Sequence, residues 1–236
     1  MQKVQTRRFA TRAELDAALA ARLEQAITAA AASGGAAIML SGGHTPLPAY
    51  RQLAARLKRT GAVRREKLHV LFSDDRYVPR DSEASNYHAS RPLLDALALP
   101  EEQVLRVRTE LPLEEAARDY ERRLRALLDR GVAVTLGMLG LGADGHTASL
   151  FRSEDLARAR GRLALAVSRP DGLSGVSVTP DFIAHIPAPL FVIAGTGKEA
   201  AIAGLERDDP AVVAVQAVQA CPRVEVWVEQ AAERGA

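Results

Sequence analysis

The feature that most constrains this chain is the alternation of short, continuously apolar runs with longer segments of helical periodicity. The apolar runs predict strands at residues 36–40, 68–73, 132–141, 163–167, 190–194 and 224–228. Helical patterns lie between them, at residues 11–33, 47–59 and 113–130, and in a stretch that ends near residue 97. Strands that alternate with helices imply right-handed βαβ units. The sequence therefore predicts an α/β fold, with a doubly wound, mostly parallel sheet and helices on both faces.

The first predicted helix carries a clear start signal, because Thr11 and Glu14 have the spacing of a capping box. Its apolar face is formed by Leu15, Leu19, Leu23, Ile27 and Ala30. The helix at residues 113–130 is expected to bury Tyr120, Leu124, Leu127 and Leu128. The last strand, at residues 224–228, alternates Val with Glu and Trp, which predicts one wetter face. No repeat, low-complexity tract or linker divides the sequence, so we expect a single α/β domain over residues 1–236.

Composition limits the class of protein. The 31 basic and 29 acidic residues give a formal net charge of +2, and this balance does not predict a nucleic-acid surface. Cys221 is the only cysteine, the N-terminus lacks the apolar core of a signal peptide, and no apolar stretch approaches the roughly 20 residues of a membrane span. We therefore expect a cytoplasmic protein that does not engage a membrane. No Cys/His cluster or H-E-x-x-H motif is present, so neither a metal nor a cofactor is expected.

Ligands of doubly wound sheets bind beyond the carboxyl ends of the strands, so the loops that follow strands are the candidate binding segments. The first such loop is residues 41–46, with the sequence S-G-G-H-T-P. Its two glycines allow close approach of a ligand, its hydroxyls are hydrogen-bonding groups, and the following helix adds unpaired N–H groups. The loop fits either a phosphate cradle or an ordinary glycine-rich turn between a strand and a helix.

Two more strand-end loops carry charge. Asp74, Asp75 and Arg76 follow the predicted strand at residues 68–73, with S-N-Y at residues 85–87 further along the same connection. An acid–arginine pair there could orient a polyol or neutralise an anion, or it could be a surface salt bridge. Lys198 follows the strand at residues 190–194, where its ammonium could reach a phosphate or remain solvated at a helix start.

The most informative loop is residues 137–151, with the sequence G-M-L-G-L-G-A-D-G-H-T-A-S-L-F. A buried strand runs into a glycine-rich turn that carries Asp144 and His146, and a carboxylate beside a histidine suits a general base. The turn also matches G-x-G-x-x-G, but no strand-end acid follows about 20 residues later, as dinucleotide binding requires. The segment ending at Lys198 likewise fails as a Walker A motif, because Glu199 stands where Ser or Thr must bind magnesium.

Taken in order, these loops resemble those of the 6-phosphogluconolactonase family, whose superfamily includes glucosamine-6-phosphate deaminase. The family's S-G-G-S-T-P loop matches residues 41–46, its D-E-R matches residues 74–76 and its S-N-Y matches residues 85–87. Its G-x-G-x-D-G-H-T-A-S-L-F run matches residues 140–151 almost residue for residue. The T-A-S-L-F after the histidine favours the lactonase branch over the deaminase branch. The matches extend from about residue 38 to residue 198.

The resemblance implies a fold like that of glucosamine-6-phosphate deaminase and ribose-5-phosphate isomerase. It also implies metal-free hydrolysis of 6-phospho-D-glucono-1,5-lactone in the oxidative pentose phosphate pathway. By that resemblance His146 is the general base on water, Asp144 holds the loop or the imidazole, and Arg76 or backbone N–H groups stabilise the oxyanion. The implied binding residues are Ser41, Gly42, Gly43, His44, Thr45, Asp75, Asn86, Gly145, Arg169 and Lys198. The expected partner is a small phosphorylated sugar lactone, and the expected state is a monomer or a small homo-oligomer.

The chain departs from the family pattern at several positions. His44 replaces a serine, Asp75 a glutamate and Arg152 a proline. The family's P-x-R-I-T-L-T segment aligns with residues 173–179 and places Gly175 where the pattern has arginine, so we expect Arg169 to substitute for that arginine. Two other functions remain open from the sequence: an amino-sugar-phosphate isomerase or deaminase, and a non-catalytic sugar-phosphate sensor.

Overall fold

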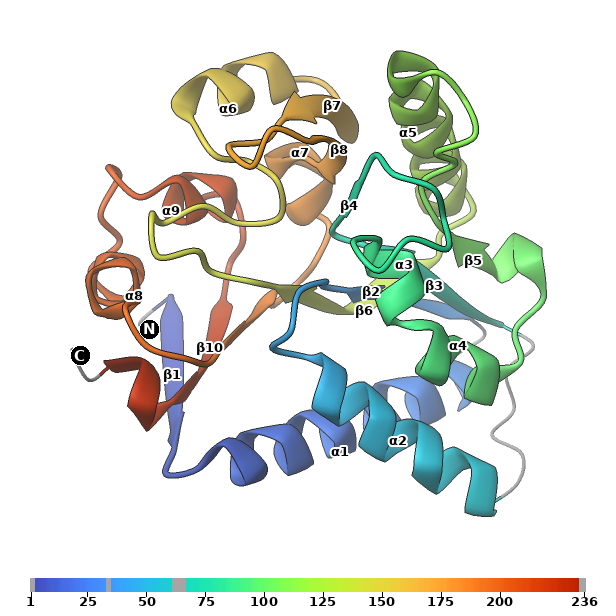
Figure 1. Cartoon of the computed structure of the whole chain (residues 1–236), viewed down its shortest axis with the longest axis horizontal. Helices are drawn as coiled ribbons and strands as arrows, with labels where there is room; N and C mark the ends of the chain where they lie inside the picture. Colours follow the sequence, from blue (N-terminus) through green and yellow to red (C-terminus); the bar gives the residue numbers. More distant parts are fainter. Residues whose placement is uncertain (1–2, 33–34, 61–66, 234–236) are drawn as a thin grey trace.

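The computed structural model describes residues 3–32, 35–60 and 67–233, and a parallel sheet lies at its centre (Figure 1). Its strands follow the order β1-β10-β9-β6-β2-β3-β5, and every neighbouring pair is parallel. Their bounds are β1 Val4–Phe9, β2 Ala36–Leu40, β3 Leu68–Phe72, β5 Val104–Leu105, β6 Ala133–Leu139, β9 Leu190–Ile193 and β10 Val224–Glu229. A second, antiparallel sheet has the order β4-β8-β7, with β4 Asp74–Arg76, β8 Ser174–Val178 and β7 Ala164–Ser168.

Helices cover both faces of the large sheet (Figure 1). One face packs against α1 Arg12–Ala32, α2 Leu47–Thr60 and α4 Arg91–Leu97, with the short α3 Asn86–Ala89 beside them. The other face packs against α5 Leu113–Asp129, α7 Pro180–Ile183, α8 Glu199–Glu206 and α9 Val213–Ala217, while α6 Ser153–Ala159 covers the small sheet. Single-turn helices lie at Glu101–Gln103 and Gln230–Glu233. The predicted doubly wound, mostly parallel sheet is therefore confirmed.

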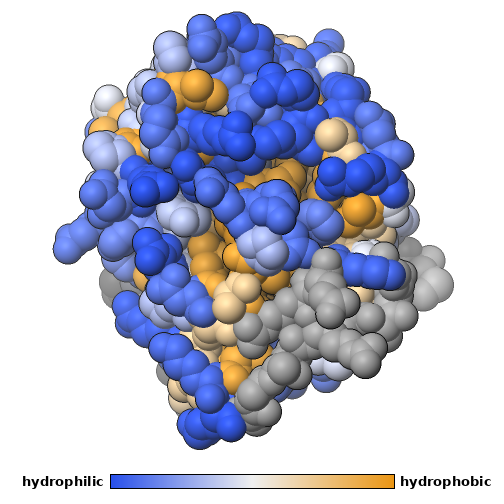
Figure 2. Space-filling model, turned by 90° about the vertical axis from the view of Figure 1, so that its right-hand side faces the viewer, coloured by the Kyte–Doolittle hydropathy of each residue, from blue (hydrophilic) through white to orange (hydrophobic). Residues whose placement is uncertain are grey.

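The central strands are apolar throughout because both of their faces are buried. In β2, Ile38 packs with α1 and α2, while Met39 packs with the cluster on the α5 side, and the whole strand is shielded from solvent. This alternation follows from the strand's repeat of two residues. Hydrophilic side chains cover most of the surface on the β5 side of the molecule, and hydrophobic ones show mainly in a central recess (Figure 2).

Several local predictions are confirmed. Glu14 accepts the backbone N–H of Thr11 while the Thr11 hydroxyl accepts the backbone N–H of Glu14, which completes the capping box. The five apolar residues predicted on that helix are all buried. In α5, Tyr120, Leu124 and Leu127 are fully buried, and Leu128 is partly buried. Helix α1 ends at Ala32; the sequence G-G at residues 34–35 predicts the end of this helix, and of these two residues Gly34 lies outside the described residues while Gly35 is not helical.

Other predictions need correction. The strand predicted at residues 163–167 is not part of the parallel sheet: it is β7, which pairs antiparallel with β8. Strands β1, β4, β5 and β8 were not predicted, because they are short or contain several polar residues. In β10 the expected wetter face is only partly present, since Trp227 is buried against Phe9, with ring centroids 5.4 Å apart. None of the helices within residues 3–32, 35–60 and 67–233 is long and apolar enough to cross a membrane.

Tyr120 joins α5 to the large sheet and gives a test of this packing. Strand β5 pairs with β3 only as far as Leu71, and the Tyr120 hydroxyl donates to the carbonyl of Phe72 at 2.6 Å and accepts its N–H at 3.0 Å. Tyr120→Phe leaves both backbone groups buried without a partner, so we expect the free energy of unfolding to fall by about 1–3 kcal/mol. Urea denaturation measures the change. The control is Tyr87→Phe, because the Tyr87 hydroxyl makes no hydrogen bond with any of the described residues. An equal loss in both variants would refute this role of the Tyr120 hydroxyl.

Candidate active site

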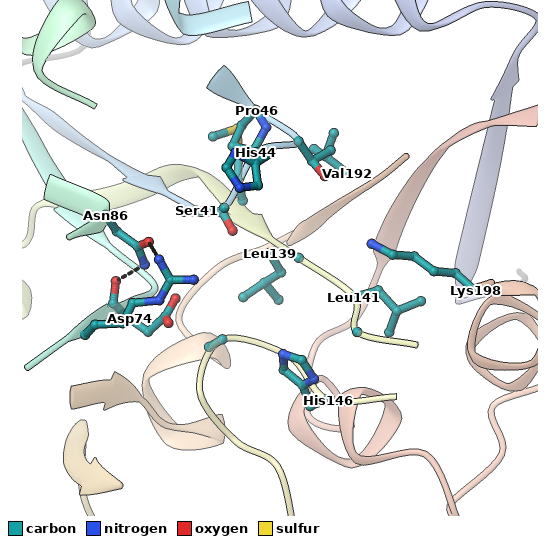
Figure 3. A pocket seen from close by; sticks show the side chains of 18 of the residues that line it. Ser41, His44, Pro46, Asp74, Asn86, Leu139, Leu141, His146, Val192 and Lys198 are labelled. Atoms are coloured by element: carbon teal, nitrogen blue, oxygen red, sulfur yellow. Dashed lines mark hydrogen bonds between the residues drawn. The ribbon is translucent and has the colours of Figure 1, made fainter. Parts of the chain in front are cut away.

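A cavity of about 310 Å³ opens where the strands of the large sheet end (Figure 3). Its walls come from the loops after β2, β6 and β9, from β4 and from the end of β7. In Figure 3, Asp74 and Asn86 lie on one side of the cavity and Lys198 on the other, with Ser41 and His146 on facing walls between them. Segments far apart in the sequence therefore meet at the carboxyl edge of the sheet, which is where ligands bind in such folds.

Most of the residues predicted from the sequence line this cavity. They are Ser41, Gly42, Gly43, His44, Thr45, Arg76, Asn86, His146, Arg169 and Lys198. The other three predicted residues, Asp75, Asp144 and Gly145, are not among those that line it. Gly145 has a φ of +82° and forms the turn before His146, so its place is in the backbone of the loop rather than on the cavity wall.

Asp144 holds the imidazole of His146 from behind. Its Oδ1 lies 2.5 Å from Nδ1 of His146 and also accepts the His146 backbone N–H at 3.2 Å. Burial alone would raise the pKa of Asp144, but these hydrogen bonds outweigh it and hold the pKa below its ordinary value. A charged carboxylate at Nδ1 favours the tautomer that carries its proton there. The other ring nitrogen, Nε2, is then free to accept a proton.

Gly142 makes room for this pair, which the sequence analysis did not recognise. A Cβ at Gly142 would lie 2.1 Å from Nδ1 of His146 and 2.4 Å from Oδ1 of Asp144. The backbone N–H of Gly142 donates to the carbonyl of His146 at 2.9 Å, which closes the loop on itself. The motif G-x-G-x-D-G-H therefore has a steric explanation at its second glycine, because any side chain there displaces the histidine.

The loop at residues 41–46 is braced from α1. Arg12 donates through Nη2 to the carbonyl of Thr45 at 2.6 Å, and its Nε is paired with Asp16 at 2.8 Å. The Tyr50 hydroxyl donates to the carbonyl of Ser41 at 2.8 Å. These contacts fix the backbone of the loop at the start of α2, where the helix contributes unpaired N–H groups and the positive end of its dipole. The loop is thus a preformed anion-binding candidate.

Arg76 and Asn86 are positioned by Asp75. The sequence predicts Asp75 as a substrate ligand, but this carboxylate lies behind the cavity wall with 2% of the residue exposed. It accepts the backbone N–H groups of Arg76 at 2.8 Å, Asn86 at 2.6 Å and Tyr87 at 3.1 Å. Nη1 of Arg76 in turn donates to Oδ1 of Asn86 at 2.9 Å. Asp75 therefore organises the wall and does not face the cavity.

A second buried network was not predicted. Asp74 lines the cavity, and its carboxylate accepts the hydroxyls of Ser73 at 2.8 Å and Ser149 at 2.7 Å. The Ser149 hydroxyl also accepts Nη1 of Arg169 at 2.7 Å. Ser149 was visible only as part of the T-A-S-L-F motif, and nothing in its sequence context indicated that it joins two strand ends.

The charged lining is mostly basic. Arg76, Arg169 and Lys198 face the cavity, against Asp74 as an acidic residue. Burial lowers the pKa of Lys198, and no carboxylate of the described residues pairs with its ammonium. Among the described residues no group of three or more His, Cys, Asp or Glu could hold a metal ion. The arrangement suits a small anion whose reaction requires His146 to remove a proton, either from the anion or from an attacking water molecule.

The chain is similar in sequence and fold to known proteins of one family. Residues 10–227 match the family described as glucosamine-6-phosphate isomerases/6-phosphogluconolactonase. The chain is 35% identical over 208 residues to a 6-phosphogluconolactonase of Homo sapiens, covering 85% of this chain and 80% of the relative. The structure of 6-phosphogluconolactonase from Trypanosoma cruzi is similar, with a TM-score of 0.82, 26% identity and coverage of 98% and 96%. A monomeric glucosamine-6-phosphate deaminase shares the fold, with a TM-score of 0.78, 17% identity and coverage of 96% and 98%.

The burial of Asp75 predicts a pH dependence of stability. Burial raises the pKa of Asp75 to about 6, although hydrogen bonds from Asn86 and Tyr87 oppose the change. Between pH 4 and 6 the folded protein therefore holds more of this proton than the unfolded chain does, and the contribution of Asp75 to stability falls as the pH rises. A pKa raised from 3.8 to about 6 corresponds to about 3 kcal/mol.

The free energy of unfolding in urea, measured for the wild type and for Asp75→Asn in steps from about pH 4 to pH 8, gives the pH-dependent contribution of the Asp75 carboxyl. The wild type should lose stability relative to the variant across the window. The exposed Asp95→Asn is the control and should run parallel to the wild type. Parallel curves for Asp75→Asn as well would contradict the raised pKa.

Proposed function

The chain belongs to the glucosamine-6-phosphate isomerase/6-phosphogluconolactonase family, and on that premise we propose that it is a 6-phosphogluconolactonase. It hydrolyses 6-phospho-D-glucono-1,5-lactone to 6-phosphogluconate in the oxidative pentose phosphate pathway. The observation that carries the proposal is the Asp144–His146 pair at the edge of a cavity whose charged lining is mostly basic. A lactone needs a base for the attacking water, and its phosphate needs cations.

His146 is the general base in this mechanism. Nε2 of the imidazole takes a proton from a water molecule as that water attacks the lactone carbonyl. Asp144 at Nδ1 orients the ring and stabilises the imidazolium that forms. The imidazole is 29% exposed, so water reaches it from the cavity. The proton then passes to the ring oxygen as the carbon–oxygen bond of the lactone breaks.

The remaining groups bind and polarise the substrate. Arg76, fixed by Asn86 and by the carbonyl of Ala84, stabilises the negative charge that develops on the carbonyl oxygen. The phosphate lies against the loop at residues 41–45, where the N-terminus of α2 favours negative charge, and Lys198 approaches from the start of α8. Holding the phosphate there sets the carbonyl beside His146 and reduces the entropy cost of the attack.

Three further properties belong to the same proposal. Residues 1–236 form one domain, since the family match spans residues 10–227 and both sheets contribute to one cavity. The protein works in the cytoplasm, in keeping with a single cysteine, Cys221, that is buried and free. It functions as a monomer or a small homo-oligomer, because each chain carries all the groups that the mechanism uses.

The first experiment is hydrolysis of freshly generated 6-phosphogluconolactone by the purified protein, corrected for the spontaneous reaction. The unphosphorylated lactone is the matched substrate, and we expect turnover well above background only with the phosphate. Ammonia release from glucosamine 6-phosphate would instead indicate a deaminase. Binding of 6-phosphogluconate without any acceleration would indicate a sensor and overturn the proposal.

The role of His146 is tested by His146→Ala. Loss of a general base lowers kcat by about a hundredfold or more, while binding of 6-phosphogluconate should survive because the phosphate cradle is intact. His185→Ala replaces an exposed histidine outside the cavity and is the control. Near-normal turnover by His146→Ala would remove this histidine from the base role.

A further inference from the structure

Gly175 lies in the middle strand of the small sheet, beneath the side chain of Arg169. Its neighbours in register are Arg76 on β4 and Val167 on β7. A Cβ at Gly175 would lie 3.3 Å from Cδ of Arg169 and 3.0 Å from the carbonyl oxygen of Asp75. Both distances are tighter than ordinary van der Waals contact. A side chain at position 175 would therefore require Arg169 or the backbone at Asp75 to shift by a few tenths of an ångström.

The guanidinium of Arg169 is held firmly at the cavity. Its side chain is 10% exposed and lines the cavity wall. Nε and Nη2 bind the carboxylate of Asp171 at distances from 2.9 to 3.2 Å, and Nη1 donates to the hydroxyl of Ser149 at 2.7 Å. The guanidinium carbon also lies 5.3 Å from the centre of the Phe151 ring. These contacts fix both the position and the plane of the group.

The pairing leaves part of the guanidinium unused. A guanidinium has five N–H donors. Asp171 takes the Nε donor and one donor of Nη2, and Ser149 takes one donor of Nη1. Within the described residues neither Nη donates a further hydrogen bond, although the carboxylate of Asp74 forms an ion pair with Nη1 at 3.9 Å. These remaining donors are available to the oxygens of a phosphate or a carboxylate.

We propose that Gly175 determines substrate specificity by admitting Arg169 to the cavity, where the braced guanidinium binds the phosphate of the substrate through Nη1 and Nη2. The inference rests on the proposed function and adds to it the residue that gives preference for the phosphorylated lactone. Asp171 and Ser149 are positioning residues: they hold Arg169 so that little side-chain freedom is lost when the anion binds. Arg169 acts together with the loop at residues 41–45 and Lys198, which the proposed mechanism assigns to the phosphate, while Arg76 remains with the carbonyl oxygen.

The relation between the two positions predicts a reciprocal exchange. Because the Cβ of a residue at 175 would start beside Cδ of Arg169, an arginine side chain from position 175 can enter the same volume once Arg169 is removed. Gly175→Arg alone places two arginines in one space and should impair binding. The double variant Gly175→Arg with Arg169→Gly should recover much of the lost affinity.

Calorimetric binding of 6-phosphogluconate and of gluconate, with kinetics on both lactones, tests the proposal. For Arg169→Gln we expect affinity for 6-phosphogluconate to fall about tenfold or more, the scale for charge-assisted hydrogen bonds. Gluconate binding should be unchanged, and KM should rise while kcat changes little. For Gly175→Ala we expect the same weaker binding of 6-phosphogluconate, unchanged gluconate binding and raised KM. The urea unfolding midpoint of each variant shows whether it remains folded. Arg160→Gln removes an exposed arginine outside the cavity and is the charge-matched control.

The outcomes separate this inference from the proposed function. A wild type that binds and turns over the phosphorylated substrate, with Arg169→Gln within about twofold of it, overturns the role of Arg169 and leaves the lactonase proposal standing. Equal losses for gluconate and 6-phosphogluconate would also overturn it, because they indicate a general disturbance of the wall. A wild type that neither binds 6-phosphogluconate nor hydrolyses its lactone overturns both. Recovery in the double variant supports the exchange even if Gly175→Ala folds poorly.

Discussion

Two adjacent buried carboxylates, Asp74 and Asp75, hold the cavity together. They lie where the chain leaves the large parallel sheet and enters the small antiparallel one. Burying a carboxylate is unfavourable unless hydrogen bonds replace the lost water. Asp75 offsets part of this cost by accepting three backbone N–H groups and the Ser85 hydroxyl, and Asp74 by accepting two serine hydroxyls and pairing with Arg169. The need to satisfy these two groups therefore determines where the surrounding loops lie.

The two carboxylates act in different directions. Asp75 accepts the backbone N–H of Asn86 at the start of α3, and the Asn86 side chain in turn accepts a hydrogen bond from the guanidinium of Arg76. Asp74 reaches across to Ser149, and through it to Arg169 at the end of β7. The small sheet thus brings the guanidinium of Arg169 to the cavity wall beside Asp74. The large parallel sheet forms the edge at which ligands bind, and the small antiparallel sheet adds a second wall to the cavity at that edge.

The sequence predicted the parts of this architecture that depend on local pattern. Strands buried on both faces, such as residues 36–40, are recognisable because every position is apolar. The capping box at Thr11 is likewise local, as is the placing of candidate residues at strand ends. Strand β8 could not be predicted from its pattern, because S-G-V-S-V is short and polar at positions that long-range pairing buries. The scaffold role of Asp75 was also out of reach, since three of its four partners, Ser85, Asn86 and Tyr87, lie ten to twelve residues away and a strand-end carboxylate resembles a ligand.

The base and the arginine proposed to bind phosphate share one neighbour. The ring of Phe151 lies 4.4 Å from the imidazole of His146, centroid to centroid, and 5.3 Å from the guanidinium carbon of Arg169. One rigid aromatic side chain therefore sets the spacing between these two groups. Glycines make room at both ends of this arrangement, Gly142 beside His146 and Gly175 beneath Arg169. The contacts of Phe151 and the space left by the two glycines therefore determine where the proposed base and the proposed phosphate-binding arginine lie relative to each other.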